Sequence, residues 1–192
     1  MNQFYNKEKA RLQSLLPKNQ DYSKRLDKLT HKRNNKIKNY LHNTSRSIIN
    51  HLVFNNIGTL VIGYNPGWKQ EVSLGKRNNQ NFVTIPFLKF VQQLEYKTAL
   101  VGIKTIITEE SYTSKCSFLD LEEICQHDEY IGKRKNRLFI SGEGKIIHSD
   151  VNGSFNIMRK VFPKEFSNGI EAVVVQPLRI TPYKVNCSQS HI

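Results

Sequence analysis

Residues 101–114, Val-Gly-Ile-Lys-Thr-Ile-Ile-Thr-Glu-Glu-Ser-Tyr-Thr-Ser, place two adjacent glutamates at the end of a short apolar run. The apolar run predicts a buried strand that leads directly into Glu109 and Glu110. A later acid, Asp150, opens the stretch Asp-Val-Asn-Gly-Ser-Phe-Asn-Ile at residues 150–157. Ligands of open α/β sheets bind at the carboxyl ends of strands, so these acids indicate a functional site at that edge of the sheet.

The segments around these acids predict an α/β fold. Residues 58–64 form another apolar run bounded by turn formers, and a helix is expected to open at Pro86. Residues 144–148 predict a third short strand, which Asp150 ends, and a helix is expected from Asn152 until Pro163 stops it. The strand–helix–strand order indicates packing around a mixed or parallel sheet.

Residues 1–52 predict a basic helical segment. One helix is expected over residues 5–16, and a longer one runs from about Asp21 to Leu52 with apolar residues at helical intervals. Residues 1–46 contain twelve Lys and Arg against three Asp and Glu, which gives +9 of the total net charge of +13. This segment therefore concentrates the positive charge of the chain.

The charge predicts a polyanionic partner. The 29 Lys and Arg exceed the 16 Asp and Glu, which sets up a field that attracts nucleic acid in a salt-dependent way. We expect the second helix to follow phosphates, although an amphipathic helix with merely solvated charges has the same pattern. The candidate contacts on it are Lys24, Arg25, Lys28, Lys32, Arg33, Lys36 and Lys38.

Two further basic clusters are candidates for the same role. The loop after the first strand contains the only tryptophan, Trp68, beside Lys69, with Lys76 and Arg77 further on. An aromatic ring among cations can stack on a base while the cations bind the nucleic-acid backbone. The alternative is that Trp68 only packs against the inner side of its own loop. The second cluster is expected on a hairpin or loop and comprises Lys133, Arg134 and Lys135.

Several other classes of protein are disfavoured. No apolar run approaches the roughly 20 residues that a membrane span needs, and the first residues lack the apolar region of a signal peptide. The three cysteines are odd in number and lack CxxC spacing, which argues against a disulfide framework and a zinc ribbon. We therefore expect a protein of the reduced cytoplasm.

The acids point to magnesium chemistry if the fold brings them together. Glu110 and Asp150 would then form a hard oxygen site suited to Mg²⁺. Two such metals, about 3.5–4 Å apart, activate a water and stabilise the leaving oxygen of a phosphodiester. Two other interpretations remain open, because Asp150 is also a favoured residue to cap a helix and paired glutamates are usually surface residues.

Three segments resemble a known family. Residues 58–87, 108–123 and 149–163 resemble the C-terminal half of TnpB, a transposon-encoded protein similar to the nuclease half of type V CRISPR effectors. The resemblance implies a RuvC-like domain of RNase H type that cuts DNA under a guide RNA, with three acids and magnesium. Asp150 matches the last of these acids in its Asp-x-Asn setting.

The chain departs from the family pattern at the middle acid and at the zinc ribbon. Many relatives have an acid on the strand where this chain has Gly63, so the neighbouring strand is expected to supply it, from Glu110 or failing that from Glu109. Only one of two adjacent residues on a strand faces a given side. The paired CxxC motifs of the relatives are absent around residues 115–140, so no structural zinc is expected. Only Cys116 lies near that place, and Cys125 and His127 follow further along in no ligand spacing.

The third departure concerns the first acid of the family, which lies in an Ile-Asp-x-Gly strand. No such motif precedes the basic helices, and the chain is expected to begin just after it. This predicts an incomplete RNase H-like, RuvC-type mixed sheet at residues 53–165, flanked by helices, and a weak magnesium site. The strand at residues 58–64 would lack its partner unless an upstream chain completes the sheet. Residues 166–192 are expected to form a tail.

Three functions follow from the resemblance. The leading hypothesis is a nucleic-acid-binding fragment of a TnpB-type endonuclease, with DNA and a guide RNA as partners and no complete catalytic site, so that the chain alone is inactive. The second is an active Mg²⁺-dependent DNA endonuclease completed by an upstream segment. The third is a nuclease-dead, RNA-guided DNA-binding regulator.

Overall fold

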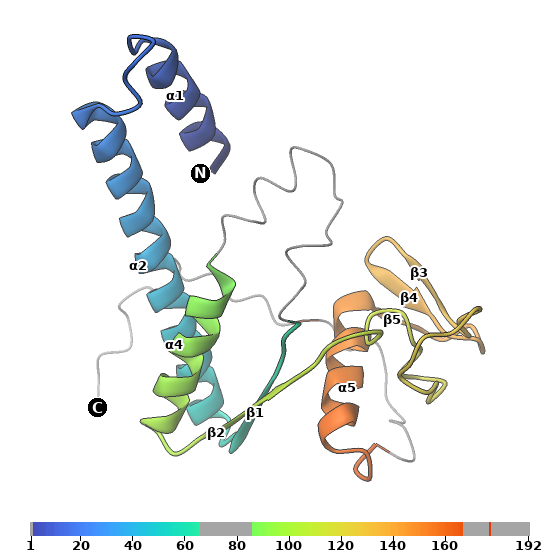
Figure 1. The fold of residues 1–192 in the computed structure, drawn as a ribbon. Helices are drawn as coiled ribbons and strands as arrows, with labels where there is room; N and C mark the ends of the chain where they lie inside the picture. Colours follow the sequence, from blue (N-terminus) through green and yellow to red (C-terminus); the bar gives the residue numbers. More distant parts are fainter. Residues whose placement is uncertain (1, 66–85, 167–176, 178–192) are drawn as a thin grey trace. The chain divides into compact units, whose positions relative to one another are not determined.

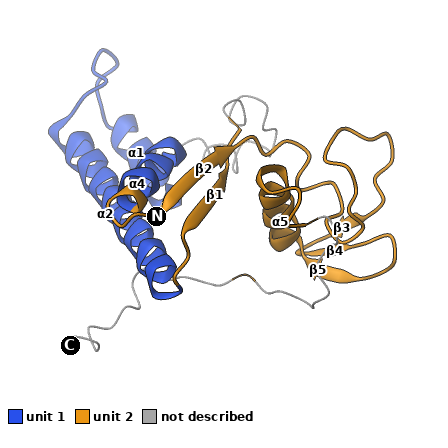
Figure 2. Cartoon of the chain, turned by 90° about the horizontal axis from the view of Figure 1, so that it is seen from below, with its two compact units in different colours: residues 1–55, 69–97, 180–192 blue, residues 56–68, 98–179 orange. Residues whose placement is uncertain are grey.

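The computed structural model describes residues 2–65, 86–166 and 177, and its chain divides into two compact units. One unit comprises residues 1–55, 69–97 and 180–192, and the other comprises residues 56–68 and 98–179 (Figure 2). No helix within the described residues is long and apolar enough to cross a membrane. The helices and strands (Figure 1) are α1 (Asn2–Ser14), α2 (Lys24–Phe54), β1 (Thr59–Gly63), α4 (Phe87–Ala99), β2 (Lys104–Thr108), β3 (Lys133–Lys135), β4 (Leu138–Ile140), β5 (Ile146–His148) and α5 (Ser149–Val161).

The long basic helix α2 confirms the helical periodicity of the N-terminal segment. It begins after Ser23, whose hydroxyl accepts the backbone N–H of Leu26 at 3.2 Å and so caps the first turn. The start expected near Asp21 is therefore a few residues early. The buried side chains of α2 fall on the predicted apolar stripe and include Leu26, Leu41, Ile49 and Leu52.

Helix α1 packs against α2 through an aromatic contact. The Tyr5 hydroxyl lies 3.1 Å from the Thr30 hydroxyl, and the guanidinium carbon of Arg33 lies 5.1 Å from the centre of the Tyr5 ring. Leu12 is buried on the same helix. These contacts show that Arg33 has a structural partner, unlike a freely solvated cation.

Helix α4 lies beside α2 in both views of the ribbon (Figures 1 and 2). Lys97 of α4 is only 5% exposed, and its ammonium donates to the carbonyl of His42 at 3.0 Å and to the hydroxyl of Ser45 at 2.6 Å. Burial lowers the pKa of Lys97, and the charge of Arg46 adds to this effect. The two helices are therefore joined by a buried cation that is satisfied by oxygen atoms.

The second unit contains the parallel pair β1–β2, in a register that runs from Thr59 opposite Lys104 to Gly63 opposite Thr108. Both strands were predicted, and β2 begins later than the apolar run because the chain first turns at Gly102, whose φ is +73°. Strand β2 pairs with one edge of β1, so the expected loss of a partner strand concerns only the other edge. Among the described residues no strand pairs with the other edge of β1.

The remaining strands form a separate antiparallel sheet in the order β3–β4–β5. The basic cluster forms strand β3 and continues into a hairpin, in which Asn136 takes a φ of +58°. Strand β5 was expected beside the other strands of one mixed or parallel sheet, but it pairs with β4. Only residues 141–145 connect β4 to β5, and so short a connection permits an antiparallel pair and no parallel crossover.

Helix α5 contacts both sheets and starts earlier than expected. It begins at Ser149 instead of Asn152, because the Nδ1 atom of His148 accepts the backbone N–H of Asp150 at 3.2 Å and caps the helix. The interpretation of Asp150 as the cap is therefore wrong, and Asp150 is an acid of the first turn. The core below this helix is formed by Phe139, Ile147 and Val151, packed against Leu119 and Phe155.

Candidate active site and nucleic-acid interface

Glu109, the first residue after β2, is bound to helix α5. Its Oε2 atom accepts a hydrogen bond from the ammonium of Lys160 at 2.8 Å, and its Oε1 atom accepts the N–H of Ser111 at 2.5 Å. Lys160 also donates to the carbonyls of Glu109 and Ser111, at 3.2 and 3.0 Å. The hydrogen bonds from Lys160 and Ser111 lower the pKa of Glu109. The Glu109 carboxylate therefore binds the segment at residues 109–111 to helix α5.

Glu110 instead lies against Gly63 of the neighbouring strand. A Cβ atom added at Gly63 would lie 2.9 Å from the Oε2 atom of Glu110 and 2.5 Å from the Cδ1 atom of Ile157. The Glu110 carboxylate thus fills space next to the position at which relatives have an acid. Burial raises the pKa of Glu110, and the charge of Glu109 raises it further, while Lys160 opposes the rise.

These contacts distinguish the two glutamates that the sequence left as alternatives. Glu109 is occupied by Lys160, whereas Glu110 is half-buried beside the glycine. Geometry therefore favours Glu110 as the candidate metal ligand, and its role in catalysis stays a prediction.

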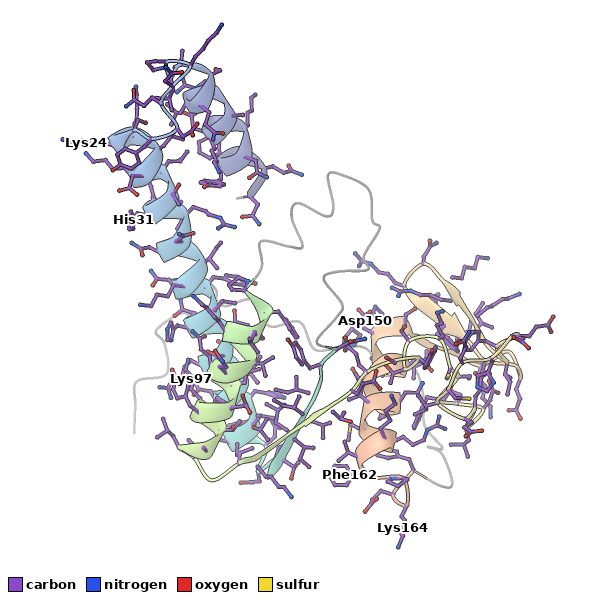
Figure 3. The ribbon with its side chains drawn as sticks, in the orientation of Figure 1. Lys24, His31, Lys97, Asp150, Phe162 and Lys164 are labelled. Carbon is purple, nitrogen blue, oxygen red and sulfur yellow. The ribbon has the colours of Figure 1, made fainter. Side chains whose placement is uncertain are left out.

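Asp150 lies in the first turn of α5 (Figure 3). Its side chain is 73% exposed, with Oδ2 lying 3.8 Å from Nδ1 of His148. Asp150 and Ile157 are seven residues apart, which places them on one helix face but about 10 Å apart along the axis. Helix α5 therefore carries Asp150 in its first turn and, through Ile157 nearer its end, contacts the space beside Glu110.

The acids of the described residues can be compared with the ligand set that magnesium requires. Carboxylates are suitable ligands, but Mg²⁺ requires short, near-octahedral contacts at about 2.0–2.1 Å. Within the parts of the chain that the structure describes, no group of three or more His, Cys, Asp or Glu side chains is placed to hold a metal ion. The described residues therefore do not assemble a complete site, and no chemical step through a metal follows from their geometry.

Two buried asparagines connect the acidic turn to α5, and sequence reasoning missed their role. Asn152 accepts the N–H of Phe118 at 2.9 Å and donates to the carbonyl of Cys116 at 2.9 Å. Asn156 donates to the carbonyls of Thr113 and Cys116, at 2.9 and 2.8 Å. The available signal was a pair of amides at i and i+4 on an otherwise apolar helix face. They hold together two of the segments that carry the family resemblance.

A buried carboxylate, that of Glu122, joins two distant points of the region around residues 115–140. Glu122 is only 4% exposed and accepts the N–H of Ser117 at 2.6 Å and that of Ile131 at 3.0 Å. Burial raises the pKa of Cys116, whose thiol donates to a backbone carbonyl, and zinc binds the thiolate form instead. The Cys116 thiol thus has a backbone hydrogen-bond partner, and the absence of a structural zinc stays a prediction.

The predicted basic contacts on α2 form an ordered stripe. Lys24, Lys28, Lys32 and Lys36 follow one another at intervals of four residues, and all four are exposed. Residues four apart are neighbours on a helix surface, and each step also turns by about 40° around the axis. The stripe therefore winds around α2 while extending for about 18 Å, roughly the length of five nucleotides of one strand in a duplex.

The other predicted contacts fall into three groups. On α2, Arg25 and Lys38 are exposed and Arg33 is half-buried against α1. In the second unit, the three basic residues of β3 are all exposed. The remaining candidates lie outside the described residues and are Trp68, Lys69, Lys76 and Arg77.

Comparison with known proteins identifies the family. Residues 1–69 match the model of a probable transposase, OrfB_IS605, and residues 87–157 match the Cas12f1-like TNB domain. The TnpB-like protein ORF457 of Acidianus two-tailed virus is 26% identical over 169 residues, which cover 82% of this chain and 34% of that protein. These matches together support a TnpB-family protein. The chain spans about a third of the length of this curated relative.

A solved structure shows the fold of this TnpB-family protein. The Cas12f1 chain of a Cas12f1–sgRNA–target DNA complex matches with a TM-score of 0.55 and 18% identity. The match covers 80% of this chain and 40% of the Cas12f1 chain. The RuvC-like α/β fold expected from the sequence is therefore confirmed.

Replacing Lys160 by methionine is expected to raise the pKa of both glutamates of this TnpB-family protein. Glu109 would lose the hydrogen bond that lowers its pKa, and Glu110 would lose the charge that opposes the rise. Glu109 stabilises the fold above its ordinary pKa and loses this contribution as the pH falls through its lowered pKa. The pH dependence has the opposite sign for Glu110. Its contribution to the stability of the fold is complete below its ordinary pKa and disappears as the pH rises through its raised pKa.

Carboxyl-carbon NMR titration would measure both values, with Lys135→Met as the control because that exposed lysine lies on β3. In the unsubstituted protein Glu110 should titrate at the higher pH. The assignment of the two environments would be wrong if Glu109 titrated above Glu110.

Proposed function

We propose that this chain supplies nucleic-acid binding to a TnpB-type, RNA-guided DNA endonuclease, and that its described residues hold only part of the catalytic site. The observation that carries the proposal is the exposed lysine stripe on α2, made of Lys24, Lys28, Lys32 and Lys36. The stripe lies in the segment that contains most of the net charge. The Cas12f1 neighbour was solved with an sgRNA and a target DNA, which supports DNA and RNA as the partners proposed here.

The first test is the salt dependence of binding. Four phosphate contacts correspond to a slope near −3.6, so affinity should fall on the order of 100-fold between 50 and 200 mM salt. Changing the four stripe lysines to glutamine should remove most of that slope. Fluorescence anisotropy with labelled duplex DNA and RNA, without magnesium, measures both quantities.

A matched control distinguishes the stripe from net charge alone. The control variant changes four exposed lysines elsewhere to glutamine, namely Lys7, Lys18, Lys104 and Lys164. If the control loses as much affinity as the stripe variant, the stripe is not the interface. If the unsubstituted protein shows no salt-sensitive binding, the proposed function is wrong.

We further propose that Glu110 and Asp150 are the metal ligands of this partial site and that the chain by itself binds Mg²⁺ weakly. Among the described residues no group of three or more acids, histidines or cysteines is placed to hold a metal, so cleavage by the chain alone is expected to be slow or undetectable. When bound, Mg²⁺ would supply charge stabilisation at a phosphodiester.

An active endonuclease completed by a further segment is the second candidate. The observation that favours it is the half-buried Glu110 beside Gly63, with a raised pKa that a bound cation would reverse. Mg²⁺-dependent cleavage that Asp150→Ala abolishes would support this candidate. Cleavage that survives the substitution would contradict the assignment of Asp150.

A further inference from the structure

Helix α2, Pro86 and helix α4 line a partly open cavity of about 450 Å³ within the first unit. Among the described residues its lining combines three kinds of side chain and includes no acid. The cations are Arg33, Lys38 and Lys89, and the amides are Asn34, Asn35 and Gln93. Apolar surface comes from both sides of the cavity.

The cations of this cavity favour an anion. Lys38 projects from α2 and Lys89 from α4, and both are exposed. Among the described residues neither lysine forms an ion pair with a carboxylate. Arg33 already donates to Asn34 at 3.1 Å and covers the Tyr5 ring. The two lysines are therefore the anchors at which a phosphate would bind.

A buried charge lies behind one wall of the cavity. The Oε1 atom of Gln93 lies 3.4 Å from the hydroxyl of Ser45, and that hydroxyl accepts a hydrogen bond from the ammonium of Lys97. Lys97 follows Gln93 by one helical turn and is labelled in Figure 3. This chain of contacts orients the Gln93 amide and adds positive potential, which is screened less in the interior than at the surface.

We propose that this cavity receives one unpaired nucleotide of a single-stranded nucleic acid. Lys38 and Lys89 would bind its phosphates, while Asn34, Asn35 and Gln93 would hydrogen-bond to its base. Amide side chains both donate and accept, as recognition of the edge of a base requires. The inference rests on the proposed function and adds to it a specific site.

The shape and lining of the cavity favour an unpaired nucleotide over the other polyanions. Its volume lies within the range of about 300–1,000 Å³ that is usual for small-ligand sites. Ile37, Leu41 and Pro86 offer apolar contact for a base, which a free phosphate would not use. A duplex hides the Watson–Crick edges of its bases, so it would reach only the rim of the cavity.

The test compares a 12-nucleotide single strand that contains 2-aminopurine with the duplex of the same sequence, using the full 192-residue chain. The double variant Lys38→Gln, Lys89→Gln and the single variant Asn35→Ala should each weaken single-strand binding about tenfold. Neither should change duplex binding by more than about twofold. The 2-aminopurine fluorescence should change on binding, and Asn35→Ala should reduce that change without altering the salt slope.

The control variant is Lys24→Gln, Lys28→Gln in the lysine stripe, which should weaken binding to the single strand and the duplex alike. Equal losses for both nucleic acids in the cavity variants would overturn the nucleotide site. Unchanged single-strand affinity in these variants, together with a loss in the stripe variant, would overturn the site and leave the proposed function intact. Failure of the unsubstituted protein to bind either nucleic acid would overturn both.

Discussion

Replacing Asn152 by alanine is expected to lower the free energy of unfolding of the second unit by about 2–4 kcal/mol. The Asn152 side chain is fully buried, and it satisfies the N–H of Phe118 and the carbonyl of Cys116. Alanine would leave the Phe118 N–H without a partner and open a small cavity. Asn156 would still donate to the carbonyl of Cys116, so the loss is that of one backbone donor plus packing.

Urea denaturation would measure this loss, and native-state hydrogen exchange would locate it in residues 110–118 and α5. Ser154→Ala is the matched control on the same helix, because that side chain is exposed and bonds only within the helix. Asn152→Asp retains an acceptor but buries a charge, so it should be at least as destabilising as alanine. A loss below about 1 kcal/mol for Asn152→Ala would contradict the role assigned to this amide.

Replacing Glu122 by alanine is expected to destabilise the same unit by about 3–5 kcal/mol. Its carboxylate joins the start and the end of one long connection by accepting the N–H groups of Ser117 and Ile131. Both donors would lose a charged acceptor inside the protein, where an unpaired polar group is costly. Thermal unfolding and hydrogen exchange at Ser117 and Ile131 would measure the effect.

The exposed neighbour Glu123 provides the control, since its substitution by alanine removes no side-chain hydrogen bond among those described. Glu122→Gln should cost less than alanine because the amide oxygen can still accept one of the two N–H groups. A chelator should leave the melting temperature unchanged if the carboxylate, and no metal, closes this region. A fall in melting temperature on chelation would show that zinc contributes.

Local sequence features predicted much of this fold because they depend on periodicity and turn residues. The spacing of Leu26, Leu41 and Ile49 predicted the buried face of α2, and the apolar runs predicted β1 and β2. The start of α5 was missed because its cap is His148, a residue that is uncommon in that position.

The candidate site was only partly predictable. The position after a strand identified Glu109 and Glu110 as candidates, and the family resemblance selected Asp150. The amides of Asn152 and Asn156 were missed because buried polar residues in a helix have meaning only through their partners, which lie 34 to 43 residues away. The cavity between α2 and α4 was missed for the same reason, since its lysines come from different helices.

The sequence alone therefore determined the family, the basic character of the first helices and the acids worth testing, because these depend on residue identity and local spacing. Only the tertiary structure separated Glu109 from Glu110, through Lys160 on one side and Gly63 on the other. It also placed β5 in a sheet with β3 and β4, separate from β1 and β2. The physical reason is that strand pairing and helix packing join residues far apart in the chain, and no local pattern encodes which of them meet.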